Sequence, residues 1–383
     1  MQPGQKRDPR SMFDELRSSG PIARGNDGTW TILGHELVRR VAVDADRFSS
    51  AVSRFVQVPN GMDGAEHECY RALVDGYLTS ARVMELEPRC EAIVADLVAE
   101  LPRVQPVEAV RGIGARCAVR FQIDWLGWSK SLEPLLLAWI DDYRGIVASG
   151  DDVRHVQIAA RFDAIIRGEL AARRADQQPC NDVTAELMRD TVNSMPLSDD
   201  EIVSILRNWT AGDLGSLAAS VGIIVHRLAT HADLQNELRT RSIRLAAGDE
   251  ADRPAFDRAL DEILRIDDPF LRNRRIATCD VELDGHVIPK GSKVELVWTA
   301  ANRDPAIFHN PDAYQPDENS EHNLVYGIGP HICPGRALAT MELRVITAAL
   351  LRATTSIELA PEAATERSIG GIGGFRSVRV LLH

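Results

Sequence analysis

Long apolar runs are missing from this chain of 383 residues. No stretch of about eighteen consecutive apolar residues occurs, which argues against a membrane-spanning helix. The first ten residues also lack the apolar segment of a secretory signal. We therefore expect a soluble, cytoplasmic protein that binds no membrane.

Paired cysteines and an excess of basic residues are lacking as well. The six cysteines show neither a disulfide framework nor the CxxC spacing of a zinc site. The net charge is −12, from 44 basic and 56 acidic residues, which argues against broad binding to a nucleic-acid backbone. No Gly-x-Gly-x-x-Gly nucleotide fingerprint, internal repeat or low-complexity tract is present. Each cysteine must therefore be interpreted from its own surroundings.

Helical patterns are the most common feature of the sequence. A short β-unit at 29–33 is followed by mostly helical patterns to about residue 240. Ser198-Asp-Asp-Glu201 has the form of a capping box and predicts the start of a long helix that runs to about His231. Alternating residues at 280–297 predict strands, and Arg336–Arg352 is helical again. We expect a mainly α protein with small β-sheets at both ends (α+β).

One cysteine lies in a segment that is neither helix nor strand. In Tyr326-Gly-Ile-Gly-Pro-His-Ile-Cys333-Pro-Gly-Arg336, glycines and prolines disfavour both. The glycines allow the backbone to approach a flat ligand closely. The helix that begins near Arg336 turns its positive end toward the sulfur, where it would stabilise a thiolate.

This segment resembles the haem-ligand signature of the cytochrome P450 family. The residues that carry the resemblance are Tyr326, Gly327, Cys333 and Gly335, with Gly329, His331 and Arg336 also fitting the form common in soluble members. Tyr326 stands where the family usually has Phe. The resemblance implies that Cys333 is the iron ligand of a haem b group (iron protoporphyrin IX).

Other segments resemble further motifs of the same family. Glu262-Ile-Leu-Arg265 matches its Glu-x-x-Arg, and His67-Glu-Cys-Tyr-Arg71 matches its His-x-x-x-Arg. Arg275 occupies the place of the strand arginine. Two haem propionates are dianionic in total and costly to bury unpaired. The resemblance therefore implies that His67, Arg71, Arg275 and His331 contact them.

The long helix departs from the family pattern. It reads Thr210-Ala-Gly-Asp-Leu-Gly-Ser216, and neither alignment register restores the adjacent acid and threonine of the oxygen-activation motif. Asp213 and Ser216 are three residues apart and can share a face. We hypothesise that Ser216 replaces the alcohol and Asp213 the acid of the proton relay. The alternative is that Asp213 points elsewhere. The two glycines within this helix also indicate that another group, either of the protein or of a ligand, approaches it closely.

A second departure precedes the cysteine. Family members often carry an arginine there that joins the Glu-x-x-Arg pair, but the spacing places Glu318 at this point, next to Asn319. Either another group completes the network or the loop runs differently.

The resemblance implies a single domain over residues 1–383 with the cytochrome P450 fold. Haem would lie between the long distal helix and the helix after Cys333. By analogy, the pocket walls come from 49–62, from Asn208, Ala211 and Gly212, from 269–271 and from 371–375.

The implied activity is a monooxygenase that inserts one oxygen atom from O₂ into a small or medium, mostly apolar organic substrate. Electrons would come from a separate ferredoxin or flavodoxin-type donor with its reductase, docking near Arg336. Two alternatives stay open. One is a peroxide-driven or rearranging haem-thiolate enzyme, and the other is a non-catalytic haem-binding sensor.

Overall fold

The computed structural model describes residues 8–383 except 54, 104, 150–151, 177–180, 362–364 and 369–371. The α-helices are α1 (Pro9–Ser18), α2 (His35–Val43), α3 (Gly64–Tyr77), α4 (Ser80–Glu100), α5 (Arg116–Leu126), α6 (Glu133–Ser149), α7 (Asp152–Ala175), α8 (Val183–Leu187), α9 (Asp199–Thr230), α10 (Ala232–Ala246), α11 (Arg253–Ile266), α12 (Trp298–Ala301), α13 (Pro316–Asn319) and α14 (Arg336–Ala353). A π-helical segment (Ala109–Ala115) leads into α5, and short 3₁₀ turns lie at Lys130–Leu132, Glu250–Asp252 and Ser320–His322.

The strands are short and form five small sheets in the described chain. They are β1 (Ile22–Arg24), β2 (Trp30–Ile32), β3 (Phe48–Ser49), β4 (Val107–Glu108), β5 (Thr191–Val192), β6 (Met195–Pro196), β7 (Arg272–Ala277), β8 (Val281–Leu283), β9 (His286–Ile288), β10 (Lys293–Val297), β11 (Ile357–Leu359), β12 (Glu366–Arg367), β13 (Phe375–Ser377) and β14 (Arg379–Leu382). The predicted mainly α architecture with small sheets is confirmed.

The largest sheet joins segments from both ends of the chain. Its order is β1-β2-β10-β7-β3, with β10 parallel to β2 and the other pairs antiparallel. The register sets Val294 of β10 opposite Arg275 of β7. A second sheet has the order β11-β14-β4, and β5-β6, β8-β9 and β12-β13 are two-stranded. The strands predicted within 280–297 correspond to β8, β9 and β10.

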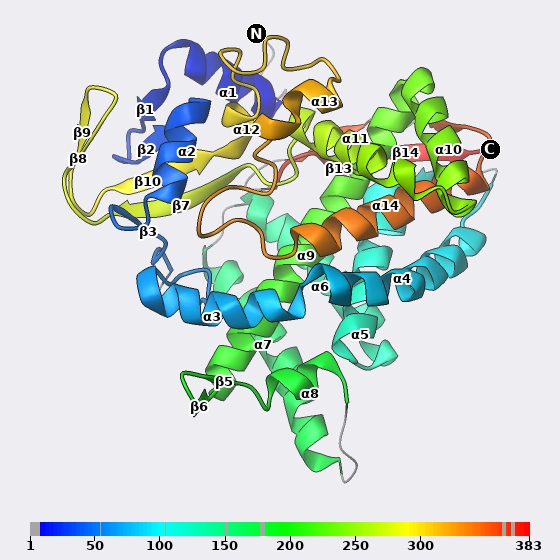
Figure 1. The fold of residues 1–383 in the computed structure, drawn as a ribbon, viewed down its shortest axis with the longest axis horizontal. Helices are drawn as coiled ribbons and strands as arrows, with labels where there is room; N and C mark the ends of the chain where they lie inside the picture. The colour runs from blue at the N-terminus through cyan, green and yellow to red at the C-terminus, as the bar shows by residue number, and fades with distance from the viewer. Residues whose placement is uncertain are drawn as a thin grey trace.

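Helix α9 passes through the middle of the molecule (Figure 1). Its predicted capping box is present, because the Glu201 N–H donates to Ser198 Oγ at 3.3 Å and the Ser198 N–H donates to Glu201 Oε2 at 2.7 Å. The helix has 32 residues, which gives it a length of about 48 Å at about 1.5 Å per residue. Helices α5, α11 and α14 pack against it.

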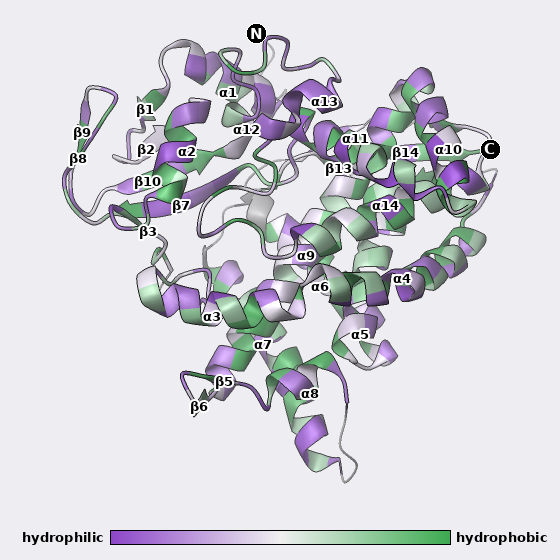
Figure 2. Ribbon diagram, in the orientation of Figure 1, coloured by the Kyte–Doolittle hydropathy of each residue, from purple (hydrophilic) through white to green (hydrophobic). Residues whose placement is uncertain are grey.

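Apolar residues concentrate around this central helix. The largest core cluster includes buried residues of α4, α5, α9, α11 and α14, and a second cluster lies beneath the five-stranded sheet. Figure 2 shows polar colour on outer helices such as α10. Within the described residues, no helix is both long and apolar enough to span a membrane.

Candidate active site

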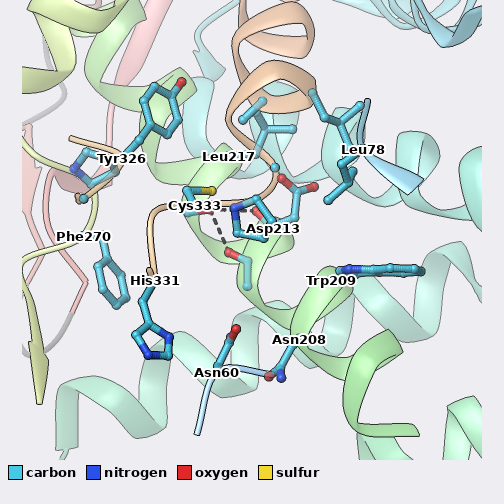
Figure 3. A pocket seen from close by; sticks show the side chains of 18 of the residues that line it. Asn60, Leu78, Asn208, Trp209, Asp213, Leu217, Phe270, Tyr326, His331 and Cys333 are labelled. Carbon is cyan, nitrogen blue, oxygen red and sulfur yellow. Dashed lines mark hydrogen bonds between the residues drawn. The ribbon is translucent and has the colours of Figure 1, made fainter. Parts of the chain in front are cut away.

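A cavity of about 350 Å³ lies between α9 and the loop that carries Cys333 (Figure 3). One wall is formed by Cys333 with neighbouring residues of its loop and of α14, and the opposite wall by α9. The turn after α11, strand β7 and the loop before α3 also contribute side chains. Segments far apart in the sequence therefore meet around one cavity.

The cysteine loop is held by its own backbone. The N–H of Cys333 donates to Tyr326 O at 2.9 Å, and the N–H of Ile332 donates to Gly329 O at 3.0 Å. Gly327 and Gly329 have φ values of +72° and +80°, a region that favours glycine. At Gly329 a Cβ atom would also lie only 2.9 Å from a carbonyl oxygen of α2. Gly329 therefore allows a close approach of the cysteine loop to α2.

The Cys333 side chain is exposed and lines the cavity. Although solvent reaches this side chain through the cavity, the protein atoms around the sulfur reduce its hydration and raise the pKa of its thiol, and the opposing hydrogen bond from the Gly335 backbone N–H does not offset this. The prediction that a thiolate is stabilised at this position concerns the protein with its metal bound, and it stays a prediction. A bound metal cation would add the positive charge that this balance lacks.

Two of the four predicted propionate contacts line the cavity, namely His331 and Arg275. His331 Nε2 lies 2.9 Å from Ser50 Oγ. Burial, together with the nearby His67 and Arg275, lowers the pKa of His331 to about 4, so the ring is neutral at pH 7. Arg275 is only 6% exposed, and in the described chain it forms no ion pair with a carboxylate. Burial lowers its pKa, and the attraction of Asp63 offsets this only in part.

The other two predicted contacts lie behind this wall. The ring centroid of His67, on α3, is 4.2 Å from that of His331, and burial lowers the pKa of His67. Arg71 donates through Nη1 to the carbonyl oxygens of Pro330 and Ile332, both at 2.8 Å. Arg71 therefore holds the cysteine loop against α3.

On the opposite wall, Asp213 and Ser216 both line the cavity, as their shared helix face predicts. Gln122 Nε2 donates to Asp213 Oδ2 at 2.9 Å, and burial raises the pKa of Asp213 to about 7. Ser216 Oγ donates back to Gly212 O at 2.7 Å, which leaves its lone pairs as acceptors. Among the described residues, no atom outside the local helix backbone lies within 4 Å of a Cβ atom built at Gly212 or Gly215. No other described segment therefore approaches the helix closely at these two glycines.

The Glu-x-x-Arg pair is completed by an asparagine. Arg265 is fully buried, and its guanidinium contacts the Glu262 carboxylate at 2.7 and 2.9 Å. Asn319 Nδ2 donates to Glu262 Oε1 at 2.7 Å, and the Gln315 N–H donates to the same oxygen at 3.0 Å. The second departure in the sequence is thereby explained, because an amide next to Glu318 supplies the donor that an arginine would supply.

The predicted pocket walls are correct in part. Asn208, Gly212, Pro269 and Phe270 line the cavity, together with Val58, Pro59 and Asn60 of the loop at 49–62. Ala211, Leu271 and Phe375 pack into apolar cores instead, and Gly371 lies outside the described residues. The loop is fixed to α9 by Ser204, whose Oγ donates to Val56 O and accepts from the Val58 N–H.

Gln122 and Asn319 were missed by the sequence reasoning, as was Glu342, a fully buried carboxyl on α14. Gln122 lies 91 positions before its partner Asp213, and Asn319 lies 57 positions after Glu262. No local pattern marks either residue. The sequence indicated a role only for Asn319, because it lies next to the position where family members often have an arginine.

Comparison with known proteins identifies the family. The model of the family described as Cytochrome P450 matches residues 150–368, which is more than half of the chain. The chain belongs to the cytochrome P450 family. This P450 is 27% identical over 366 residues to the steroid C26-monooxygenase of Mycobacterium tuberculosis (strain ATCC 25618 / H37Rv), with 92% of this chain and 88% of that protein covered. It is 24% identical to linalool 8-monooxygenase of Pseudomonas putida, covering 98% and 95% of the two chains.

Solved P450 structures share the whole fold. The crystal structure of cytochrome P450 CYP101C1 superposes with a TM-score of 0.83 at 26% identity, covering all of this chain and 95% of that chain. The ligand-free structure of cytochrome P450 TbtJ1 gives a TM-score of 0.86 at 22% identity, covering 99% and 100%. The predicted P450 fold is therefore confirmed. The chain is a cytochrome P450 monooxygenase, an oxidoreductase of a haem-binding family that uses O₂, an organic substrate and a redox partner.

The residues at the cavity fit a haem. Arg275 is a buried guanidinium with no carboxylate paired to it in the described chain, so an anion is needed beside it. His331 adds a donor on the same side, and the Cys333 side chain lines the same cavity. A buried cation and a sulfur ligand around one cavity match an iron porphyrin with anionic edge groups.

Proposed function

We propose that this P450 binds haem b through Cys333 and inserts one oxygen atom from O₂ into a small or medium, mostly apolar substrate. The second oxygen atom leaves as water after uptake of two electrons and two protons. Residues 1–383 would form one domain around this cofactor. The observation that carries the proposal is one cavity lined by three features: Cys333, Arg275, which has no carboxylate partner among the described residues, and the open face of α9 at Gly212.

Two residues would hold the cofactor from one side, and two more would support them. Arg275 and His331 line the cavity and would donate to the propionates, and His67 supports the His331 ring from α3. Arg71 is a positioning residue in this scheme, because its guanidinium is engaged by the carbonyls of the cysteine loop. When bound, a thiolate-ligated haem supplies the electron-rich iron that favours O–O cleavage.

Asp213 and Ser216 would manage protons on the opposite side. With its pKa raised to about 7 by burial, Asp213 carries a proton in a large fraction of molecules at neutral pH. Ser216 Oγ already donates to Gly212 O, so its lone pairs face an incoming donor. A proton from Asp213 would therefore reach the cavity through or beside this hydroxyl.

The distal lining suits an apolar substrate with at most a few polar groups. Val58, Pro59, Trp209 and Phe270 supply apolar surface, and Asn60 and Asn208 supply amides. The related proteins are named for a steroid and for linalool, both largely hydrocarbon compounds. The chemistry of this lining sets the substrate class without choosing among its members.

A ferredoxin or flavodoxin-type donor, with its reductase, would supply the electrons at the cysteine-loop face. Arg336 is exposed there and lies 3.5 Å from Asp261 Oδ2, a long contact that an acidic partner can replace. Cytoplasmic localisation follows from this soluble donor system and stays a prediction.

The deciding experiment is the absorption spectrum of the reduced, carbon monoxide-treated protein. The wild type should give the red-shifted band of a thiolate-ligated haem, and Cys333→Ser should lose that band while keeping the fold by circular dichroism. Cys279→Ser is the matched control, because Cys279 is an exposed cysteine outside the cavity lining. A folded wild-type protein without the band would overturn the assignment of Cys333.

Ser216→Ala tests the distal assignment. Without the hydroxyl, more of the electrons consumed should appear as hydrogen peroxide and fewer as product. Unchanged coupling would remove Ser216 from the relay. Fast turnover with hydrogen peroxide and no electron donor would instead favour the peroxide-driven alternative. Haem binding with no turnover under either condition would favour the sensor.

A further inference from the structure

Three aromatic side chains are in contact between the cavity and the outer side of α3. Trp209 lies on α9 and Trp125 on α5, and both line the cavity that Cys333 also lines. The ring centroid of Trp209 is 5.1 Å from that of Trp125 and 5.2 Å from that of Tyr77, the last residue of α3. Figure 3 shows the Trp209 ring among the side chains of this cavity. Trp209 therefore connects Tyr77 to the proposed cofactor site.

The three rings are buried and close enough to exchange electrons. Tyr77, Trp125 and Trp209 are 3%, 7% and 8% exposed. Centroid separations near 5 Å are those of aromatic rings in direct contact. Indole and phenol rings are among the side chains that lose a single electron most readily. An electron can therefore pass from Tyr77 through Trp209 to an oxidant in the cavity.

The indole nitrogen of Trp209 determines where such an oxidation would stop. The Nε1–H group can only donate a hydrogen bond. Trp209 Nε1 is fully buried, and within the described residues it has no hydrogen-bond partner. An indole that has lost an electron becomes acidic and is normally stabilised by releasing this proton. Because no described group accepts the proton, oxidised Trp209 would instead take an electron from a neighbouring ring.

The phenol of Tyr77 has the proton acceptor that Trp209 lacks. Its hydroxyl donates to Asp190 Oδ2. Burial, together with this hydrogen bond, raises the pKa of Tyr77, so the phenol keeps its proton at pH 7. The guanidinium carbon of Arg82 lies 4.8 Å from the centroid of the Tyr77 ring, and its charge disfavours a positive charge on that ring. Loss of an electron from Tyr77 must therefore be accompanied by transfer of its proton to Asp190.

A second cavity, of about 450 Å³, lies at the outer end of these contacts. Its lining includes Trp125 and the charged side chains of Arg82 and Glu186. Arg82 Nη2 donates to Glu186 Oε1 at 2.5 Å, and the two side chains are 39% and 41% exposed. A water-soluble reductant, such as a thiol or ascorbate, can therefore approach the Tyr77 ring from the side that Arg82 covers.

We propose that Trp125, Trp209 and Tyr77 form an aromatic chain that donates electrons to the cofactor when O₂ or hydrogen peroxide has oxidised it and no substrate is bound. The inference rests on the proposed function. One electron passes from an indole to the cofactor, and Tyr77 replaces it. The O–H bond of Tyr77 breaks, the proton goes to Asp190, and a neutral tyrosyl radical remains. A reductant in the second cavity then returns one electron and Asp190 returns the proton, which restores Tyr77. Each such event removes one oxidising equivalent from the cavity.

Electron paramagnetic resonance of the haem-loaded enzyme tests this aromatic chain directly. The substrate-free wild type is mixed with hydrogen peroxide and frozen rapidly. It should give a tyrosyl radical signal, identified by its change when ring-deuterated tyrosine is incorporated. Tyr77→Phe and Trp209→Phe should each abolish the signal, because the first removes the phenol and the second removes the oxidisable ring that links it to the cavity.

A second aromatic pair supplies the matched controls. Trp139 and Tyr143 stack with their centroids 5.0 Å apart, but neither ring lines either cavity. Trp139→Phe and Tyr143→Phe make the same chemical changes as the two test variants. Both controls should keep the tyrosyl signal of the wild type. Loss of the signal in either control would contradict the assignment to Tyr77.

Asp190→Asn separates proton transfer from electron transfer. Asparagine keeps the size of the side chain but cannot take up the phenolic proton. The radical should then stay on an indole, so a tryptophanyl signal should replace the tyrosyl signal. An unchanged tyrosyl signal would remove Asp190 from the proposal.

Bleaching of the haem absorbance by hydrogen peroxide gives a second readout. In the absence of substrate, Tyr77→Phe and Trp209→Phe should bleach several-fold faster than the wild type, because the oxidising equivalents stay in the cavity. Equal bleaching rates in all variants would show that the chain does not protect the cofactor.

Tyr326 is the competing site of oxidation, because it also lines the cavity. A signal that survives in Tyr77→Phe and is lost in Tyr326→Phe overturns the proposal, as does a wild type that forms no tyrosyl radical. The carbon monoxide band of each protein is recorded first. A wild type without that band refutes the haem assignment, whereas a normal band without the radical refutes only the aromatic chain.

Discussion

Substitution of Asp268 gives the sharpest test of the electrostatics of this fold. Asp268 follows α11 and is buried, and burial, with a contribution from Asp267, raises its pKa to about 8. Its oxygens accept from the Phe270 N–H and from Asn302 Nδ2, both at 3.1 Å. These bonds lower the pKa but do not offset the burial. The folded protein therefore keeps the Asp268 proton at neutral pH, whereas the unfolded chain, with a pKa near the ordinary value of 3.8, loses it.

The sign and size of the effect follow from proton linkage. A group whose pKa is raised by folding contributes stability at low pH and loses it as the pH rises toward the folded-state pKa. Between about pH 5 and about pH 7, the wild type should lose about 1.4 kcal/mol of stability per pH unit through Asp268, or about 2.7 kcal/mol in all. The amide of the Asp268→Asn variant does not titrate, so the variant does not lose this stability as the pH rises.

The variant also carries a cost that does not depend on pH. Both Asp268 oxygens face N–H donors, so the new amide NH₂ must face one of them, which costs about 1–3 kcal/mol. The variant should therefore be less stable than the wild type at about pH 5 and should gain about 2.7 kcal/mol relative to it by about pH 7. Only the slope of the difference tests the proton linkage.

Urea unfolding of the haem-loaded proteins, followed by circular dichroism at several pH values, measures this slope. Asp312→Asn is the matched control. The hydrogen bond from Arg303 lowers the pKa of Asp312, so this group is ionised in both states above about pH 5 and its removal changes stability equally at each pH. A constant difference between the wild type and Asp268→Asn across this range would refute the reasoning.

Three further substitutions test the loops around the site. Asn319→Leu should cost about 1–3 kcal/mol in the free energy of unfolding, because it removes a donor from the buried glutamate of the Glu-x-x-Arg pair, and an unchanged urea midpoint would contradict this. Gly329→Ala should lower haem occupancy, measured by the ratio of haem to protein absorbance, because its Cβ meets α2. Gly285→Ala, with φ also positive but open space around it, should not lower it. Tyr326→Phe should cost about 0.5–1.5 kcal/mol through the lost bond to Thr340, and the same change made with Thr340→Val should show non-additivity in a double-mutant cycle.

The sequence was most informative where function restricts residues that are close in the chain. The cysteine segment, the capping box of α9 and the Glu-x-x-Arg spacing all lie within a few residues, and each is present in the structure. Asp213 and Ser216 share a cavity-facing surface because three-residue spacing on a helix fixes it.

Contacts between distant segments could not be predicted in the same way. The side chain of Arg71 matched a family position for propionate contact, yet its guanidinium binds loop carbonyls that lie about 260 positions away. The contact between Gln122 and Asp213 depends on the packing of α5 on α9, which the sequence does not indicate. The pKa of the Cys333 thiol likewise depends on how the folded protein surrounds the sulfur, which raises this pKa. No local sequence pattern indicates that effect.

The internal bonding of the cysteine loop bears on how the cofactor is loaded. Backbone hydrogen bonds within the loop and the two bonds from Arg71 already fix the segment from Tyr326 to Cys333. Ordering a residue costs about 1–2 kcal/mol of conformational free energy. This ordering is completed when the polypeptide folds, so iron would meet a ligand that is already in position. Cofactor uptake should then proceed at a rate set by access to the cavity and not by local folding of the loop.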